Sequence, residues 1–204
     1  MTPRLLLATA NAGKVRELSP LLDGLGYTIL SLRDLDGVRL PPEGETSYRE
    51  NALGKARAAA AAAPVVVALG DDSGLEVDAL GGRPGVGSAR YGGPGLSDAE
   101  RVTRLLGELA AAPARRARFR CVLALVAPWG EEAAVEGVVE GVLTDRPRGT
   151  QGFGYDPIFL VPALARTFGE LSDAEKDRLS HRARAVAAAR PILARWAERL
   201  RRQT

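Results

Sequence analysis

Segments typical of strands alternate with segments typical of helices along most of the chain, and this alternation limits the fold more than any other feature. Short apolar runs bounded by glycine or proline predict strands, whereas apolar residues three and four apart predict helices. Their alternation predicts an α/β fold with a mostly buried sheet. The expected strands are Arg4–Ala8, Tyr27–Leu30, Val65–Leu69, Ala117–Ala127 and Glu132–Leu143, and the expected helices are Lys14–Leu22, Ser47–Ala63, Ser97–Ala111 and one that begins near Ser180.

The last two expected strands are long and are separated only by a turn at Trp129 and Gly130. Strands joined by so short a turn pair in antiparallel fashion, so we expect a mixed sheet. A chain of 204 residues can bury one sizeable core, or two lobes around a cleft. No repeat or linker interrupts it, so residues 1–204 are predicted to form a single domain.

The composition indicates a cytoplasmic protein without a membrane segment. The longest apolar run, Ala58–Leu69, is mostly alanine and is interrupted by Pro64, so it is too short and too weakly apolar to span a bilayer. The first residues lack the pattern of a signal peptide. The single cysteine, Cys121, lies in an apolar run and is expected to be a buried, small, apolar residue.

The net charge of +3 is mildly basic, and much of it comes from the segment Arg182–Arg202. A basic helix of this kind can bind nucleic acid, but it is more often a solvated, arginine-rich face. The second interpretation is favoured, and we expect no nucleic-acid partner.

Three residue types are so scarce that their positions carry information. Of the 28 lysine and arginine residues only Lys14, Lys55 and Lys176 are lysines, and the chain has two asparagines and one histidine. Lysine offers a compact charge on a flexible stem, where arginine offers a planar fork. A lysine retained in so arginine-rich a sequence therefore indicates a task that arginine cannot perform.

The first candidate motif is the turn Thr9-Ala10-Asn11-Ala12-Gly13-Lys14, between an expected strand and an expected helix. Such a turn of small residues exposes backbone N–H groups, and the helix dipole adds partial positive charge, so the turn suits a phosphate. Lys14 would add a full charge. The spacing is not that of a P-loop, and an ordinary strand–helix turn fits equally well.

The second motif is Gly70-Asp71-Asp72-Ser73-Gly74, where the third strand is expected to end. Two carboxylates at the end of a buried strand are costly unless a cation or hydrogen bonds compensate them. Magnesium binds one or two carboxylates together with substrate phosphate oxygens, and Ser73 can hydrogen-bond a phosphate or a sugar. An Asp-rich turn without a ligand is the alternative.

Nearby residues could complete such a site. Glu43 and Glu45 offer further carboxylates in a loop rich in proline and glycine. Asn51 and Lys55 lie four residues apart on an expected helix, so both side chains point the same way.

The third motif is Gly152-Phe153-Gly154-Tyr155-Asp156-Pro157. Glycine lets a backbone approach a ligand closely, Phe153 and Tyr155 offer aromatic faces for a flat base, and Asp156 offers an acceptor. Packing of both rings in the core is the alternative. A fourth motif, Ser180-His181-Arg182, follows Lys176, and His181 could equally be an ordinary residue at a helix start.

Together these stretches resemble the inosine triphosphate pyrophosphatase-like family, whose members act on non-standard purine triphosphates. The resemblance runs in family order from residue 5 to about residue 185. The matching stretches are Thr9–Glu17, Glu50-Asn51-Ala52 with Lys55-Ala56, Asp71–Leu75, Gly85 with Ser88–Tyr91, Gly152–Pro157, and Lys176 with Ser180–Arg182.

The resemblance implies a long mixed sheet with flanking helices, two lobes around a nucleotide cleft, and a homodimer. It implies hydrolysis of inosine, deoxyinosine and xanthosine triphosphates to the monophosphate and pyrophosphate, with Mg²⁺ as cofactor. Asp72 and Lys55 would be catalytic, and Glu43 and Asp72 would bind the metal. The implied phosphate-binding residues are Thr9, Ala10, Asn11, Ala12, Gly13 and Lys14, and the implied nucleotide-binding residues are Ser73, Phe153, Gly154, Tyr155, Asp156, Lys176, His181 and Arg182.

The sequence departs from the family pattern at Ala10 and Gln151, where glycine is usual, and at Tyr48, where phenylalanine is common. The loop around Glu43 aligns least well, so Glu45 and Glu50 are rival metal ligands. Two other functions fit the same residues. One is a nucleotidyl or phosphoryl transferase, which needs a second substrate, and the other is a nucleic-acid-binding module without turnover.

Overall fold

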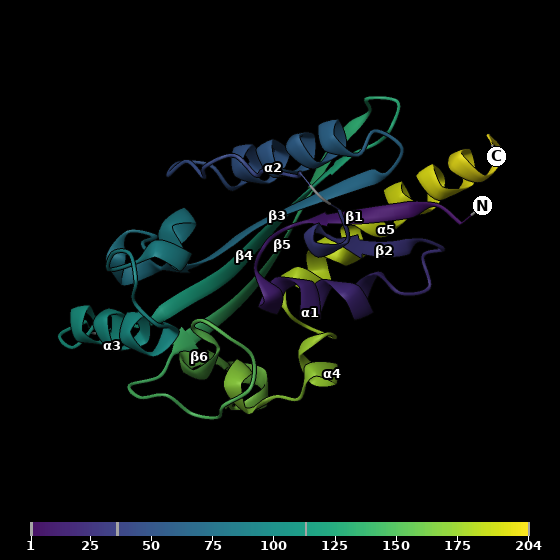
Figure 1. Cartoon of the computed structure of the whole chain (residues 1–204). Coiled ribbons are helices and arrows are strands. Elements are labelled where there is room, and N and C mark those ends of the chain that lie inside the picture. The colour runs from purple at the N-terminus through teal and green to yellow at the C-terminus, as the bar shows by residue number, and fades with distance from the viewer. Residues whose placement is uncertain (1, 36, 113, 204) are drawn as a thin grey trace. The chain divides into compact units, whose positions relative to one another are not determined.

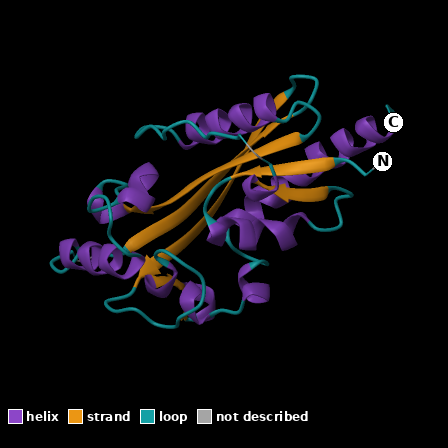
Figure 2. Cartoon of the chain, in the orientation of Figure 1, coloured by secondary structure: helices purple, strands orange, loops and turns teal. Residues whose placement is uncertain are grey.

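A computed structural model describes residues 2–35, 37–112 and 114–203 (Figures 1 and 2). Within them, seven strands form one sheet in the order β2-β1-β3-β4-β5-β6-β7, which confirms the predicted α/β class. β1 pairs in parallel with β2 and β3, whereas β6 pairs in antiparallel fashion with β5 and β7, so the sheet is mixed. The strands are β1 (Arg4–Ala8), β2 (Thr28–Ser31), β3 (Val67–Val77), β4 (Arg116–Val126), β5 (Glu132–Leu143), β6 (Phe159–Val161) and β7 (Arg166–Thr167).

Polar side chains cap the starts of α1 and α2, and α1 begins at Ala12, two residues before its expected start at Lys14. Asn11 accepts a hydrogen bond from the backbone N–H of Lys14, and Ser47 accepts one from that of Glu50. No helix in the described ranges is long and apolar enough to cross a membrane. The helices are α1 (Ala12–Leu22), α2 (Tyr48–Ala62), α3 (Asp98–Glu108), α4 (Asp173–Lys176) and α5 (His181–Arg201).

The residues cluster into two compact units, and β3, β4 and β5 contribute to both. The first unit comprises Met1–Asp72, Cys121–Gly137 and Arg182–Thr204, and the second comprises Ser73–Arg120 and Val138–His181. The single domain predicted for residues 1–204 stays a prediction.

In the first unit, successive residues of β3 point to opposite faces of the sheet. Val67 and Leu69 pack with α1 and α5 in one apolar core, which also holds Cys121. Ala68 packs with α2 in another. Figure 1 shows α2 and α5 beside the strands of this unit. By the same alternation, Asp71 lies on the face of β3 that α1 and α5 cover, and Asp72 lies on the face that α2 covers.

The second unit has its own core, built around aromatic rings. Phe119 of β4 lies 4.6 Å from Phe159 and 5.8 Å from Phe168, measured between ring centroids. Val102 and Leu105 of α3 pack against the same cluster. This core supports the segments that hold the third and fourth motifs.

The third strand differs from its prediction. It begins at Val67 rather than Val65 and continues to Val77, through the glycines that were expected to end it. The predicted turn at Gly70–Gly74 is therefore wrong. A strand can contain two buried aspartates here because both carboxylates have cationic partners, which sequence patterns do not display.

Candidate active site

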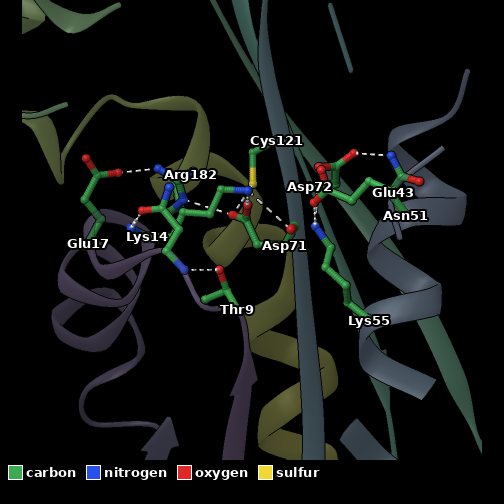
Figure 3. Close-up of polar contacts among 11 residues, drawn as sticks. Thr9, Lys14, Glu17, Glu43, Asn51, Lys55, Asp71, Asp72, Cys121 and Arg182 are labelled. Carbon is green, nitrogen blue, oxygen red and sulfur yellow. Dashed lines mark hydrogen bonds and ion pairs between the residues drawn. The ribbon is translucent and has the colours of Figure 1, made fainter. Parts of the chain in front are cut away.

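Two sets of polar side chains in the first unit lie one on each side of β3 (Figure 3). The Asp72 group consists of Glu43, Asn51, Lys55 and Asp72, and the Asp71 group consists of Lys14, Glu17, Asp71, Cys121 and Arg182. The sequence predicts one pair of carboxylates at a strand end. Because successive side chains of a strand point to opposite faces of the sheet, Asp71 and Asp72 lie on different sides of β3 instead.

In the Asp72 group, two residues of α2 hold one carboxylate of β3. The Asn51 amide donates to Asp72 Oδ2 at 2.9 Å, and Lys55 Nζ lies 3.4 Å from Asp72 Oδ1. Lys55 Nζ also lies 2.7 Å from Glu43 Oε1. The expectation that Asn51 and Lys55 share one helix face is confirmed, and the structure adds that this face meets Asp72.

Gly70 allows α2 to lie this close to β3. It occupies the same face of the strand as Asp72, two residues earlier. A Cβ atom at this position would overlap the carbonyl oxygen of Ala52 and approach the backbone nitrogen of Ala56 to 3.0 Å. The missing side chain thus sets the spacing between the helix that carries Asn51 and Lys55 and the strand that carries Asp72.

The surroundings of Asp72 suit a proton acceptor. Burial raises the pKa of its carboxyl group, and the opposing effects of Lys55 and the Asn51 hydrogen bond leave the pKa above its usual value. Burial alone would lower the pKa of Lys55, but Asp72 and Glu43 raise it overall, so the ammonium stays charged. The site therefore combines a permanent cation with a carboxylate that accepts a proton more readily than an ordinary aspartate.

Glu43 and Asp72 also fit a magnesium ion, because both carboxylates meet at the same ammonium group, and Mg²⁺ needs only one or two carboxylates when phosphates supply the rest. The described residues contain no cluster of three or more His, Cys, Asp or Glu side chains suited to a metal. Of the three rival glutamates, Glu45 and Glu50 are exposed, and Glu43 contacts Lys55.

The Asp71 group is a buried chain of alternating charges. Lys14 Nζ lies 2.5 Å from Asp71 Oδ1, and Arg182 Nε lies 2.9 Å from Asp71 Oδ2. The Arg182 guanidinium also contacts the carboxylate of Glu17. Burial raises the pKa of Asp71, but Arg182 and Lys14 outweigh it and hold the pKa well below the usual range. Asp71 is thus a fixed anion.

The turn that was predicted to bind phosphate surrounds the start of α1. Thr9 Oγ1 accepts from the backbone N–H of Asn11 at 3.2 Å, and Asn11 Oδ1 caps the helix. Ala10, Asn11 and Ala12 are exposed, whereas Gly13 is half-buried. The helix N-terminus and the Lys14 ammonium therefore belong to one segment, as an anion site requires.

In the second unit, Lys176 and Asp156 form a buried ion pair with an Nζ–Oδ2 distance of 2.5 Å. The same carboxylate oxygen accepts from the backbone N–H of Phe153 at 2.8 Å. Lys176 Nζ lies 5.4 Å from the ring centroid of Phe153. The side chains of Phe153 and Ser73 are half-buried, as is Gly154. Three predicted nucleotide-binding residues thus lie together.

Two residues of the third and fourth motifs pack inside the second unit. Tyr155 belongs to the apolar core and donates its hydroxyl to the carbonyl of Ser88 at 2.9 Å, so the alternative of core packing applies to its ring. His181 is buried and stacks on Phe119, with ring centroids 4.7 Å apart.

His181 and Arg182 are neighbours in sequence but cluster with different units. Arg182 is buried against Asp71 and Glu17, so its contact with a base stays a prediction. The role of Asp71 as the anchor of Lys14, and the place of Glu17 beside Arg182, were not predicted from the sequence. The available signal was that Glu17 follows Lys14 by three residues, on the same helix face.

The sequence matches the family model described as the Ham1 family over residues 5–192. It is 51% identical over 187 residues to a dITP/XTP pyrophosphatase of Thermus thermophilus, covering 91% of this chain and 89% of that protein. It is 48% identical over 186 residues to a dITP/XTP pyrophosphatase of Geobacter sulfurreducens, covering 90% and 93%.

Solved structures agree with this similarity. A HAM1 protein from Coxiella burnetii matches 95% of this chain and 99% of its own, with a TM-score of 0.82 and 39% identity. A nucleoside-triphosphatase described as a dITP/XTP pyrophosphatase, from Mycobacterium abscessus, matches 93% and 99%, with a TM-score of 0.73 and 42% identity.

Proposed function

The chain belongs to the Ham1 family, and from this premise we propose that it hydrolyses non-standard purine nucleoside triphosphates to the monophosphate and pyrophosphate. The substrates would be the inosine, deoxyinosine and xanthosine triphosphates, in keeping with the names of its relatives. The observation that carries the proposal is Asp72, a buried carboxylate of raised pKa that lies between Lys55 and Asn51 and near Glu43.

In the proposed mechanism, Asp72 accepts a proton from the water that attacks a phosphorus atom, and pyrophosphate leaves. Asn51 orients the carboxylate through Oδ2, while Lys55 neutralises charge that develops on the phosphate oxygens. Glu43 and Asp72 would hold Mg²⁺, which supplies charge neutralisation to the phosphate chain when bound.

The segment Thr9–Lys14 would hold the phosphates. Its exposed backbone at the start of α1 and the Lys14 ammonium both favour anions. Asp71 keeps that ammonium in place, because Lys14 Nζ lies 2.5 Å from Asp71 Oδ1 and donates to the backbone carbonyl of Asp71 at 3.4 Å.

The preference for a 6-carbonyl purine is proposed to depend on His181. An N–H donor that faces position 6 suits inosine or xanthosine, whereas adenine offers an amino group there, and a donor then meets a donor. A site built on such hydrogen bonds rejects the wrong base by roughly 10⁴-fold. Comparing kcat/KM for inosine triphosphate and ATP, in the natural protein and in His181→Ala, tests this proposal. If His181→Ala keeps the same preference for inosine triphosphate over ATP, another residue recognises position 6 of the purine.

The products test the reaction itself. The purified protein should release pyrophosphate and the monophosphate in one step, from inosine triphosphate in water with Mg²⁺. Initial release of orthophosphate and a diphosphate would sink the proposal, and turnover that requires a second acceptor would indicate a transferase.

We further propose a homodimer in the cytoplasm, as the family resemblance implies. Light scattering of the purified chain gives its molar mass, and a monomeric mass at micromolar concentration contradicts the dimer.

A further inference from the structure

The only cysteine of the chain contacts a site carboxylate. Cys121 lies on β4, which neighbours β3 in the sheet, and its Sγ atom donates to Asp71 Oδ2 at 3.2 Å (Figure 3). Neither side chain is exposed. The expectation of a buried apolar residue is correct about its burial but does not account for this contact.

The two oxygens of the Asp71 carboxylate contact different side chains. Oδ2 accepts from Cys121 and from Arg182 Nε, and both donors belong to fully or almost fully buried side chains. Oδ1 contacts Lys14 Nζ, whose side chain retains 13% exposure. One oxygen is therefore held by the core, while the other faces the more accessible lysine.

The position on β4 accepts few side chains that could do this. Cys121, Leu123 and Leu125 lie on one face of β4 and belong to the same apolar core, so residue 121 must be small and apolar enough to pack there. A thiol satisfies this packing and still donates a hydrogen bond. Burial and the nearby Asp71 raise the pKa of Cys121 well above its usual value, so its proton is retained.

We propose that Cys121 is a positioning residue that, together with Arg182, fixes the rotation of the Asp71 carboxylate so that Oδ1 holds the Lys14 ammonium ready for the triphosphate. Without the thiol donor, Oδ2 loses one of the hydrogen bonds that hold it, and the carboxylate can turn away from Lys14. The proposal rests on the proposed function, because it assigns Lys14 to the phosphates.

A spectroscopic test needs no enzyme activity. Because the chain has one cysteine, its infrared spectrum contains a single S–H stretching band. A hydrogen bond to a carboxylate lowers the frequency of that band relative to a thiol in an apolar solvent. A band at the frequency of the unbonded thiol in the unmodified protein overturns the proposal, whatever any variant does.

Kinetics test the effect on substrate. Cys121→Ala removes the donor together with the sulfur atom, and it should raise the KM for inosine triphosphate about fivefold with a smaller change in kcat, since one hydrogen bond to a charged group is lost. Cys121→Ser keeps a donor and should hold KM within about twofold of the natural value. Val122→Ala is the packing control, because Val122 is also buried on β4 but belongs to the core on the other face.

The double variant with Lys14→Gln separates positioning from packing. If Cys121 acts through Lys14, Cys121→Ala should raise KM no further once Lys14 is replaced. An equal increase in both backgrounds, or the same increase in Val122→Ala, contradicts the proposal. If the unmodified protein turns over no triphosphate while its S–H band is lowered, the proposed function fails and the contact with Asp71 stands.

Discussion

Asp71 and Asp72 are consecutive residues of one strand, yet their surroundings differ in almost every respect. Asp71 is wholly buried between two cations, and its pKa is held well below the usual range. Asp72 has one cation and one amide as partners, lies near a second carboxylate, and has a raised pKa. The pKa of one carboxyl group is thus lowered and that of its neighbour is raised, because the two side chains lie on opposite faces of β3.

The difference separates two tasks. A carboxylate that stays ionised over a wide pH range suits the anchoring of a lysine, whereas one of raised pKa suits the acceptance of a proton. Asp71 should therefore matter most for stability and placement, and Asp72 should matter most for the chemical step.

The largest effect is expected from Asp71→Asn. This change leaves the buried Arg182 and the half-buried Lys14 with one anion fewer, and breaking a buried ion pair costs about 3 kcal/mol or more. For a chain of this size, that is a fall in Tm of roughly 10 °C. Calorimetry of both proteins at pH 7 measures it, and an unchanged Tm would remove Asp71 from its anchoring role.

Asp72→Asn should show the reverse pattern. The shape is kept while the proton acceptor is lost, so kcat should fall about 10²-fold or more. The Tm should stay close to that of the natural protein, because relief of a buried, destabilised charge offsets the weaker contact with Lys55. A variant that loses stability but keeps kcat would invert the comparison between the two aspartates.

Lys55→Arg is expected to have an intermediate effect. The position is buried between Asp72 and Glu43, where a planar fork does not replace a compact ammonium, so kcat/KM should fall by about tenfold. Arg57→Lys is the matched control on the same helix, since Arg57 is exposed and pairs with Glu132, outside the Asp72 group. Equal activity in all three proteins would show that the kind of cation at residue 55 is unimportant.

The smallest effect concerns pH. An aspartate acts as a base only when it has lost its proton, so activity is lost as pH falls through its pKa. Because the pKa of Asp72 is raised from 3.8, the acidic limb of the kcat/KM profile should lie above that pH. The Asn51 hydrogen bond lowers this pKa, so Asn51→Ala should move the limb to higher pH. Profiles at a free Mg²⁺ concentration low enough to leave the free enzyme without metal measure the shift, and movement to lower pH would exclude Asp72 as the titrating group.

The sequence predicts the larger elements of the fold because each has its own local pattern. Ser47 marks the start of α2, and the apolar runs on both sides of Trp129 mark β4 and β5. It does not predict β6, β7 or α4, which are only two to four residues long and depend on the surrounding core. The length of β3 was also missed, since glycine and aspartate favour turns unless tertiary contacts override them.

The site was predicted residue by residue, but its arrangement was not. The resemblance indicates Asp72, Lys55 and Lys14, and the helix spacing places Asn51 beside Lys55. Which carboxylate meets which cation depends on the register of β3 against α1, α2 and α5, and this register appears in no local pattern. Arg182 shows the limit of prediction from the sequence. The resemblance assigns it to the nucleotide, and in the structure it forms an ion pair with Asp71.

The scarcity of lysine has a practical consequence. The side chains of Lys14, Lys55 and Lys176 are only 13%, 5% and 5% exposed, and each ammonium contacts a carboxylate. A protease that cleaves only after lysine therefore finds few target bonds, and they lie in the Asp71 group, in the Asp72 group and at the Lys176–Asp156 ion pair. The rate of its cleavage should report how often these regions open in the native protein, without any label or engineered residue.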